Sequence, residues 1–312
     1  MEFVKHTFNK YQPLISVVIV TYNSAPYVVE TLDSIKSQSY QNVELIVSDD
    51  ASKDDTVAIC EKWLENNKKR FVAVRLLSVP TNAGVVKNFN RGLAATRGTW
   101  LKLLAGDDCL PKDALSKMVE FIRLNPHCEI LHAPVLKFKV DETDTVVFEE
   151  HFSDHPKVLN NKVPAFKQFE ILTKGCAVNA PAVFIKKTII ERYGNFDTEI
   201  PNCEDWPYWL KITKLGIQFY YINEPLAYYR VREDSIYSAG SKDFYITPFY
   251  KTEKKIFEKY IEPYVSFTQK YLTKYDFFLK NIFSKSKASL VTKILFTTLR
   301  QPVLFFLKVS RK

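Results

Sequence analysis

The chain has 312 residues, enough for one large globular domain with an appendage. Hydrophobic residues make up 46% of it and charged residues 25%, proportions that exclude a disordered chain. The five cysteines are widely spaced and form no CxxC pair, so they predict neither a zinc cluster nor a disulfide framework and favour a reducing compartment, the cytoplasm. The polar opening segment, Met1–Pro13, has no apolar core and predicts no secretory signal.

The positive charge is concentrated at the end of the chain. The formal net charge is +9, and Lys251–Lys312 holds 14 Lys and Arg against four Asp and Glu. The first 250 residues hold 30 against 31. We therefore expect a nearly neutral main domain followed by a basic tail.

The first 130 residues alternate strand-like and helix-like segments, which is typical of a parallel sheet with crossover helices. Continuous apolar runs predict four buried strands, at Leu14–Thr21, Val43–Val47, Val72–Leu77 and Trp100–Leu104. Apolar residues at helical spacing predict a helix after each strand. The first helix is expected to be capped by Ser24, with Pro26 in its first turn, and the second to begin at Asp54 or Asp55. The third is expected over Val85–Arg97, with Gly98 as its C-cap. The fourth is expected to begin at Pro111 and to end just before Pro126.

This alternation stops after residue 130. A helix is expected over Asp205–Leu215 and a polar loop over His151–Val163. Short strands are expected around them, and the first two suggest a hairpin around Asp141–Asp144. The expected strands are Glu129–Val140, Thr145–Phe148, Ala182–Ile185, Gln218–Ile222 and Leu226–Arg230. The pattern predicts an α/β fold: an open, mostly parallel sheet flanked by helices, with a small mixed β region and a helical basic tail.

Aromatic and aliphatic residues recur every three or four positions through the tail, interrupted by Pro263. The segment Leu290–Lys312 then combines apolar residues with Lys and Arg, and no stretch of about 18 uncharged apolar residues occurs. A basic amphipathic helix lying in a lipid interface fits this pattern better than a membrane-spanning helix. The residues of the stripe are Ile256, Tyr260, Tyr264, Phe267, Tyr271, Tyr275, Phe278 and Ile282.

Two pairs of adjacent aspartates, Asp49-Asp50 and Asp107-Asp108, each follow a predicted strand. The carboxyl ends of parallel strands form the edge at which open α/β sheets bind ligands. Adjacent carboxylates repel each other, so a divalent cation or a ligand with donor groups explains their placement. Solvated turn aspartates are the alternative for both pairs, and a helix cap before Pro111 is a further alternative for the second pair.

Four segments carry a resemblance to a known family. They are Pro13-Leu-Ile-Ser-Val-Val-Ile-Val-Thr-Tyr-Asn23, Val47-Ser-Asp-Asp-Ala-Ser-Lys-Asp-Asp-Thr56, Asn82-Ala-Gly84 and Leu104-Ala-Gly-Asp-Asp108. In order and spacing they resemble the family 2 inverting glycosyltransferases of the GT-A fold, over about Pro13 to Ser235. The resemblance implies a glycosyltransferase domain over 1–245, with a nucleotide-sugar-binding half (13–125) and an acceptor-binding half (126–245), and places 246–312 outside it as a membrane-associating tail.

The resemblance implies roles for residues of the donor site. Asp108 is expected to bind Mn²⁺ or Mg²⁺, with Asp107 nearer the ribose, and Asp50 to accept a hydrogen bond from uracil. Arg232 stands where the family often has His and is expected to contact the diphosphate, because Arg cannot be a neutral metal ligand. The other residues expected at the donor are Val20, Tyr22, Asn82, Gly84, Lys87 and Asn88. Arg is common in the family where this chain has Phe89.

Glu204-Asp205-Trp206 matches the acid–acid–aromatic motif of the family. The resemblance implies that Asp205 is the general base for the acceptor hydroxyl, with Glu204 orienting the acceptor or the base. The alternative is an acid that interacts with the dipole of the following helix.

The function implied is inverting, metal-dependent sugar transfer from a UDP-sugar, with dTDP sharing the same base edge. The basic tail suggests a lipid-linked acceptor and a peripheral position on the inner face of a bacterial cell membrane, in cell-surface polysaccharide synthesis. A sugar-1-phosphate nucleotidyltransferase is disfavoured because the first strand leads into a turn without glycine. A nucleic-acid-binding protein is disfavoured because the main domain is nearly neutral and the end of the tail is aliphatic.

Overall fold

The computed structural model describes residues 11–140, 146–148, 159–232, 246–287 and 289–310. Its strands are β1 (Ile15–Thr21), β2 (Val43–Asp49), β3 (Ala73–Ser78), β4 (Trp100–Ala105), β5 (Ile130–His132), β6 (Val135–Val140), β7 (Val146–Phe148), β8 (Phe184–Lys186), β9 (Phe219–Tyr221) and β10 (Ala227–Arg230). Its α-helices are α1 (Val28–Lys36), α2 (Thr56–Asn67), α3 (Val85–Ala94), α4 (Ala114–Leu124), α5 (Ala165–Leu172), α6 (Lys187–Tyr193), α7 (Asp205–Lys214), α8 (Tyr250–Ile256), α9 (Phe267–Phe283) and α10 (Leu290–Ser310).

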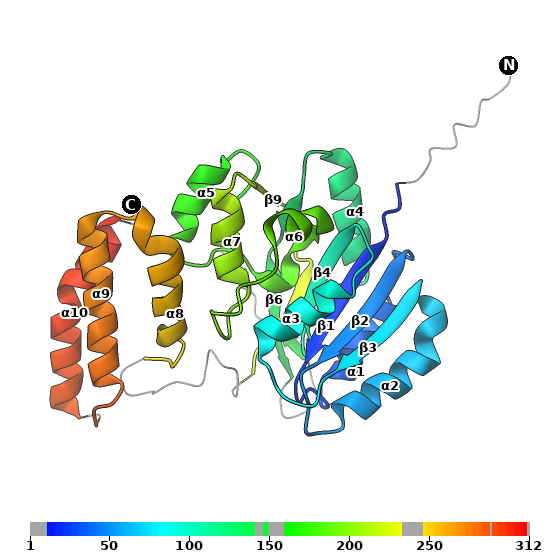
Figure 1. Ribbon diagram of the computed structural model, residues 1–312, viewed down its shortest axis with the longest axis horizontal. Helices are drawn as coiled ribbons and strands as arrows, with labels where there is room; N and C mark the ends of the chain where they lie inside the picture. The colour runs from blue at the N-terminus through cyan, green and yellow to red at the C-terminus, as the bar shows by residue number, and fades with distance from the viewer. Residues whose placement is uncertain (1–10, 141–145, 149–158, 233–245, 288, 311–312) are drawn as a thin grey trace, which may run out of the picture.

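A seven-stranded sheet forms the centre of the molecule, in the order β3-β2-β1-β4-β8-β5-β9 (Figure 1). Strands β1 to β4 are parallel, as predicted, and β8 runs antiparallel to β4 and to β5. A second sheet has the order β10-β6-β7. The expected α/β fold, a mostly parallel sheet flanked by helices with a smaller mixed sheet and a helical tail, is therefore confirmed.

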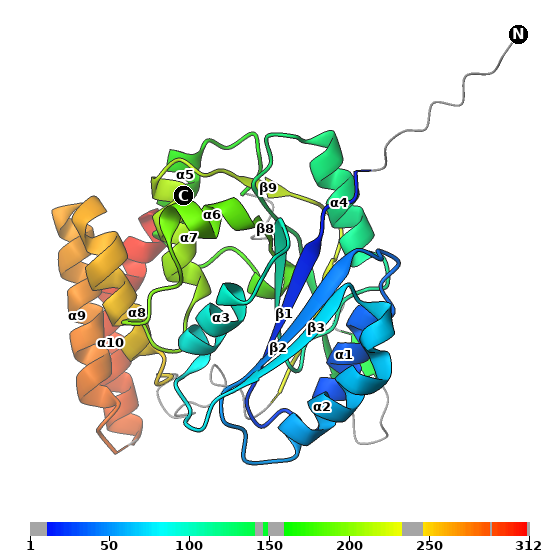
Figure 2. The same cartoon turned by 45° about the vertical axis from the view of Figure 1, so that its right-hand side comes forward.

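The two faces of the large sheet are covered by different helices (Figure 2). Side chains alternate along a strand, so Ile15, Val17 and Ile19 of β1 pack into the core formed with α1, α2 and α4. Val18 and Val20 point to the other face, into the core formed with α3, α6 and α7. Burial on both faces explains why β1 is a continuous apolar run.

Several predicted boundaries were wrong for local reasons. The third helix ends at Ala94 rather than Arg97, because the N–H groups of Arg97 and Gly98 donate to the buried Glu44 carboxylate instead of continuing the helix. The fourth begins at Ala114, not Pro111. The side chain of Ser24 does not cap α1, and its oxygen accepts a hydrogen bond from Tyr22 instead.

The strand expected over Glu129–Val140 is divided into β5 and β6, which belong to different sheets. Pro134 lies between them and has no N–H for a strand ladder. Strands β6 and β7 pair antiparallel, but the hairpin turn expected at Asp141–Asp144 and most of the loop expected at His151–Val163 lie outside the described residues.

The tail forms α8, α9 and α10 rather than one interrupted stripe, and these helices lie beside α7 in both views (Figures 1 and 2). Phe277, Leu279 and Phe283 make up the buried side of α9. Most of the predicted aromatic stripe on this helix instead faces solvent, since Phe267, Tyr271, Phe278 and Ile282 are exposed. No helix in the described ranges combines the length and the low polarity that crossing a bilayer requires.

Gly98 is confined by backbone at the start of β4. Its N–H donates to Ser16 Oγ at 2.8 Å and to Glu44 Oε1 at 3.0 Å. A Cβ at this position would lie 2.6 Å from the Ser16 nitrogen and 2.7 Å from the Leu14 oxygen. These atoms belong to the central strand and the segment leading into it, so they cannot move without disturbing the sheet.

We expect Gly98→Ala to lower the free energy of unfolding by about 1–3 kcal/mol or more, because the new methyl group overpacks against backbone. Urea denaturation of the purified protein measures this. Thr81→Ala, in an exposed loop, is the matched control and should remain close to the wild type. Equal midpoints for the two variants would contradict the prediction.

Candidate active site

Both aspartate pairs lie at the same edge of the large sheet. Thr21 at the end of β1 is in register with Asp49, and Val20 is in register with Ala105 at the end of β4. The carboxyl ends of β1, β2 and β4 therefore coincide. This is the edge at which open α/β sheets bind ligands.

Asp49 is fully buried, and its carboxylate holds the turn after β2. Thr21 Oγ1 donates to Asp49 Oδ2 at 2.8 Å, and the N–H of Ser52 donates to Asp49 Oδ1 at 2.9 Å. The hydroxyl of Ser52 donates to Oδ2 as well. Asp49 therefore has a structural role in this turn.

Asp50 joins the end of β2 to the Asn82–Gly84 turn. Its Oδ2 accepts hydrogen bonds from the backbone N–H groups of Ala83 at 2.9 Å and Gly84 at 2.7 Å. Its Oδ1 lies 3.0 Å from the Arg91 guanidinium, and only 2% of the residue is exposed. Gly84 has φ of +90°, a conformation that favours glycine, and α3 begins directly after it.

Arg91 was missed by the sequence analysis, which noted instead that the family often has Arg at the position of Phe89. Phe89 packs edge-on against Phe196, with ring centroids 6.1 Å apart. Arg91, two positions later, donates to Ser48 Oγ and to the Asp49 carbonyl oxygen in addition to Asp50. The signal available in the sequence was an arginine on a short helix beginning just after the Asn-x-Gly turn.

The remaining donor-site predictions fall on both buried and exposed positions. Asn88 is buried, donates to the Thr21 carbonyl oxygen at 3.2 Å and accepts from Arg91 at 2.6 Å. Asn82 and Lys87 are exposed. The carbonyl of Val20, inside the sheet, accepts the N–H of Gly106 at 2.9 Å.

Backbone strain is concentrated beside the predicted motifs. Three non-glycine residues have positive φ among those described: Asn23 (51°), Ala51 (65°) and Asn202 (63°). The first two follow Tyr22 and Asp50, and the third lies two residues before Glu204. Strained conformations of this kind cluster at functional sites because the surrounding structure holds them in place. Tyr22, at 48% exposure, is available to a ligand at this edge.

The second aspartate pair is tied to β10. Asp108 is 2% exposed, and its Oδ1 accepts the backbone N–H of Arg230 at 3.0 Å. Burial, reinforced by the charge of Asp107, raises the pKa of the Asp108 carboxyl well above its usual value. The helix-cap alternative is wrong, because α4 begins at Ala114 and Asp113 is the residue before it.

Two arginines compensate this acid pair. The side chain of Arg230 is almost fully buried, donates to the Asp107 carbonyl oxygen at 2.9 Å and forms an ion pair with Glu30 of α1. Arg232 lies 3.0 Å from the Asp107 carboxylate and 4.7 Å from the centre of the Tyr27 ring. The predicted contact of Arg232 with a diphosphate is compatible with this position, since the guanidinium is already at the acid pair.

Within the described ranges, no three Cys, His, Asp or Glu side chains converge as a metal-binding cluster. A nearby cation favours the ionised form of a buried carboxyl whose pKa is raised, and Asp108 is such a group. Mg²⁺ is commonly held by one or two carboxylates together with water and substrate phosphates. The residues at this corner therefore fit a divalent cation that arrives with a diphosphate, not one held by protein ligands alone.

A third group of residues lies at the start of α7. Asp205 Oδ1 accepts the N–H of Trp206 at 2.7 Å and the thiol of Cys203 at 3.4 Å, and Asp205 Oδ2 accepts the thiol of Cys176 at 3.9 Å. Burial raises the pKa of Asp205, and burial together with the Asp205 charge raises the pKa of Glu204 to about 8. A position in the first helical turn is also what the helix-dipole alternative requires.

Lys102 of β4 is fully buried and holds the short 3₁₀ helix Ala180–Ala182 against the sheet. Its ammonium donates to the carbonyl oxygens of Pro181 and Val183. Burial lowers the pKa of this ammonium to about 7. This contact fixes the segment Asn179–Pro181 against β4.

The structure thus arranges the predicted residues in groups. Arg91 connects Asp50 and Asn88, and strand β10 connects Asp107, Asp108 and Arg232. Glu204 and Asp205 form a separate group with two cysteines.

Comparison with known proteins relates the chain to glycosyltransferases. The family model described as "Glycosyl transferase family 2" matches residues 16–188. The putative teichuronic acid biosynthesis glycosyltransferase TuaG of Bacillus subtilis is 26% identical over 231 residues, which are 73% of this chain and 83% of TuaG.

Two solved structures share the fold. TarS 1–349 of S. aureus, in complex with UDP-GlcNAc, aligns with a TM-score of 0.61 at 19% identity, covering 91% of this chain and 79% of that one. The mannosyltransferase PcManGT of Pyrobaculum calidifontis, in complex with GDP-Man and Mn²⁺, aligns with a TM-score of 0.56 at 19% identity, covering 96% and 84%. The family match extends over more than half of the chain, and the edge-of-sheet acids lie within it. The chain therefore belongs to glycosyl transferase family 2, and the protein is a glycosyltransferase with the GT-A fold.

Proposed function

We propose that the protein transfers a sugar from a UDP-sugar to a hydroxyl of a lipid-linked glycan, with inversion at the anomeric carbon, in the synthesis of a cell-surface polysaccharide. The observation that carries this proposal is the buried Asp108, which lies with Asp107 at the carboxyl end of β4 beside two arginines. The UDP-GlcNAc held by TarS and the name of TuaG support the donor and the pathway class.

The nucleotide is proposed to bind over the ends of β1 and β2. Tyr22, half exposed there, would stack on the base, and backbone groups near Val20 would contact it. Asp50 would accept the base N–H. Its carboxylate already takes two backbone N–H groups and Arg91, but a carboxylate has about four acceptor sites, so capacity for a ligand remains.

The diphosphate is proposed to lie at the Asp107–Asp108 corner. Asp108 would hold Mn²⁺ or Mg²⁺, which when bound supplies positive charge to the departing nucleotide diphosphate. Arg232 adds a fixed, permanently charged donor at the same corner. Arg230 is engaged with Glu30 and the Asp107 carbonyl and therefore positions β10.

Asp205 is proposed to be the general base that removes the proton from the acceptor hydroxyl, so that a single displacement inverts the sugar. The contacts from Trp206, Cys203 and Cys176 fix its carboxylate. Burial raises the pKa of the Cys203 thiol, so it remains a neutral donor and adds no charge. Glu204 keeps a proton near neutral pH and would orient the acceptor.

The acceptor class and the location are proposed from the tail. Its net positive charge and the exposed apolar side chains of α9 and α10 suit the surface of an anionic membrane. A peripheral position on the inner face of the membrane would bring the active site to a lipid-linked saccharide. We propose a UDP-sugar rather than a dTDP-sugar as the donor. A screen of nucleotide sugars distinguishes the two.

We expect Asp108→Asn and Asp205→Asn each to lower the rate of sugar transfer by about 10²–10⁴-fold, because one loses the cation site and the other loses the base. Asp108→Asn should also lose the stimulation by Mn²⁺, whereas Asp205→Asn should keep Mn²⁺-dependent binding of UDP. Asp113→Asn, an exposed residue before α4, is the control. Transfer at the wild-type rate by either variant, with a panel of UDP-sugars, would remove that residue from its role.

Glu204→Gln tests the acid pair through pH. The pKa of Glu204 is raised from 4.5 to about 8, so the folded state binds this proton more tightly than the unfolded chain does. The stability that this gives is present below pH 4.5 and is lost as pH rises toward 8. Between pH 5 and pH 8.5, the variant should therefore gain stability relative to the wild type, on the order of 2 kcal/mol.

Denaturation by urea at the two pH values measures this difference, with the exposed Glu61→Gln as the control. A difference between Glu204→Gln and the wild type that does not change with pH would show that Glu204 is already ionised at pH 5.

Arg91→Met tests the support of the nucleotide edge. The variant leaves the buried Asp50 without its cation, so we expect the free energy of unfolding to fall by about 2–4 kcal/mol. Binding of UDP, measured by calorimetry, should weaken as well. Lys62→Met on α2 removes an exposed cation that has no proposed role in the site and should change neither quantity. An Arg91→Met variant with the wild-type free energy of unfolding and the wild-type affinity for UDP would contradict the prediction.

A further inference from the structure

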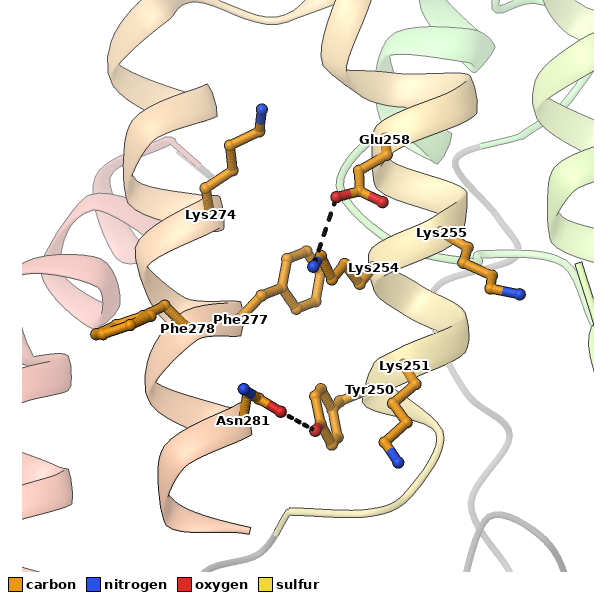
Figure 3. Close-up of a pocket in the computed structure, with 9 residues that line it drawn as sticks. All are labelled: Tyr250, Lys251, Lys254, Lys255, Glu258, Lys274, Phe277, Phe278 and Asn281. Atoms are coloured by element: carbon orange, nitrogen blue, oxygen red, sulfur yellow. Dashed lines mark hydrogen bonds and ion pairs between the residues drawn. The ribbon is translucent and has the colours of Figure 1, made fainter. Parts of the chain in front are cut away.

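A cationic cavity lies between α8 and α9, and the residues that line it include none of the acids of the proposed active site. Its volume is about 580 Å³, and Lys251, Lys254, Lys255 and Lys274 line it together with a single acid, Glu258 (Figure 3). The three lysines of α8 recur at i, i+3 and i+4, and Glu258 lies in the π-helical turn Phe257–Ile261 that follows this helix.

Acidic residues compensate this charge only in part. Lys254 is 3.7 Å from Glu258, which is longer than a hydrogen bond, and Figure 3 shows this pair between the two helices. Lys274 is 2.8 Å from Glu262, a carboxylate that it shares with Lys270. The cavity therefore keeps an excess of positive charge, which raises the local concentration of anions.

An exposed apolar stripe runs past the same cavity. Phe267, Tyr271, Lys274, Phe278 and Ile282 follow one another on α9 at steps of three and four residues, and the four apolar members are 43% to 83% exposed. Lys274 and Phe278 belong both to this stripe and to the cavity lining. Exposed apolar surface of this kind marks an interaction site, and interleaved lysines are typical of helices that lie in a lipid interface.

The neighbouring helix favours lipid over nucleic acid. Helix α10 packs against α9, with Phe296 against Phe283, and its exposed residues include Leu290, Val291 and Ile294. Aliphatic side chains cannot stack on bases, as single-stranded nucleic acids require, but they do enter the hydrocarbon boundary of a bilayer.

We propose that the cavity between α8 and α9 binds the phosphate head group of an anionic phospholipid while the stripe of α9 enters the membrane interface. This inference extends the proposed membrane association and rests on it. Lys251 and Lys254 contact the phosphate from α8, and Lys274 contacts it from α9. Phe278 packs beside the glycerol region, and Phe267 is buried among the acyl chains.

Co-sedimentation with vesicles tests the proposal. The probes are phosphatidylcholine vesicles with and without about one third phosphatidylglycerol, added to the full chain. The wild type should bind the anionic vesicles. Lys251→Gln with Lys254→Gln should lower this affinity by about tenfold or more. The control Lys36→Gln with Lys62→Gln removes the same charge from exposed positions on α1 and α2, on the far side of the molecule, and should bind within about twofold of the wild type (Figure 1).

Phe267→Ser should weaken retention at high salt, where apolar contacts persist and ionic ones are screened. Equal losses for the control and the cavity variant would overturn the proposal, because binding would then follow net charge alone. The proposal would also be overturned if the wild type bound neutral vesicles, or single-stranded RNA, as tightly as it binds anionic vesicles. It would be overturned as well if Phe267→Ser were retained at high salt like the wild type.

Sugar transfer to a soluble acceptor, measured without vesicles, separates this inference from the proposed catalysis. The cavity variant should keep the wild-type rate there, because its lysines are outside the proposed active site. If the wild type binds anionic vesicles and the cavity variant binds them equally, only the head-group site fails. If the wild type binds no vesicles at all, the membrane association fails with it and the catalytic proposal still stands.

Discussion

Repulsion between carboxylates buried at one edge of a sheet is the constraint around which this structure is organised. Asp108 is almost completely buried beside Asp107 at the end of β4. Asp50 is buried at the end of β2, which is separated from β4 by β1. Burial of unpaired charge is costly, so each acid requires a partner. Arg91 compensates Asp50, and Arg232 compensates Asp107.

The same constraint explains why the second half of the chain folds over the first. Strand β10 reaches the end of β4 through the hydrogen bond from Arg230 to Asp108 and through the contact between the Arg230 guanidinium and the Asp107 carbonyl. The small sheet of β10, β6 and β7 is anchored at this point. At the start of α7, Asp205 is held differently, by a backbone N–H and two neutral thiols. Arginines thus compensate charge at the edge that carries the aspartate pairs, whereas the hydrogen-bond donors to Asp205 in the described ranges are neutral groups.

Much of the central fold could be predicted because its signals are local. Strand β1 is continuously apolar since both its faces are covered, and each aspartate pair directly follows a strand, so the shared edge followed from parallel topology. The contacts that complete the site could not be predicted in the same way. No local pattern predicts that Arg230 meets Asp108, or that Arg91 rather than the residue at position 89 reaches Asp50.

The tail shows a similar limit. The spacing of its aromatic residues predicted a helix correctly, but spacing does not say which of two apolar sides of a helix is covered. In α9 the side with Phe277 and Phe283 packs against the rest of the molecule, and the side with Phe267 and Phe278 stays exposed. Packing against α8 and α10 decides between them, and that depends on the three helices together.

The link between β4 and β10 also bears on how the enzyme is made. Arg230 lies 122 positions after Asp108, so a ribosome synthesises the whole intervening segment before Arg230 is added. Throughout that interval the nascent chain has the edge that carries both aspartate pairs but lacks the strand that covers Asp107 and Asp108. Contacts of such long sequence separation form late in folding. The contact between β4 and β10 is therefore complete only when the second half of the domain has left the ribosome.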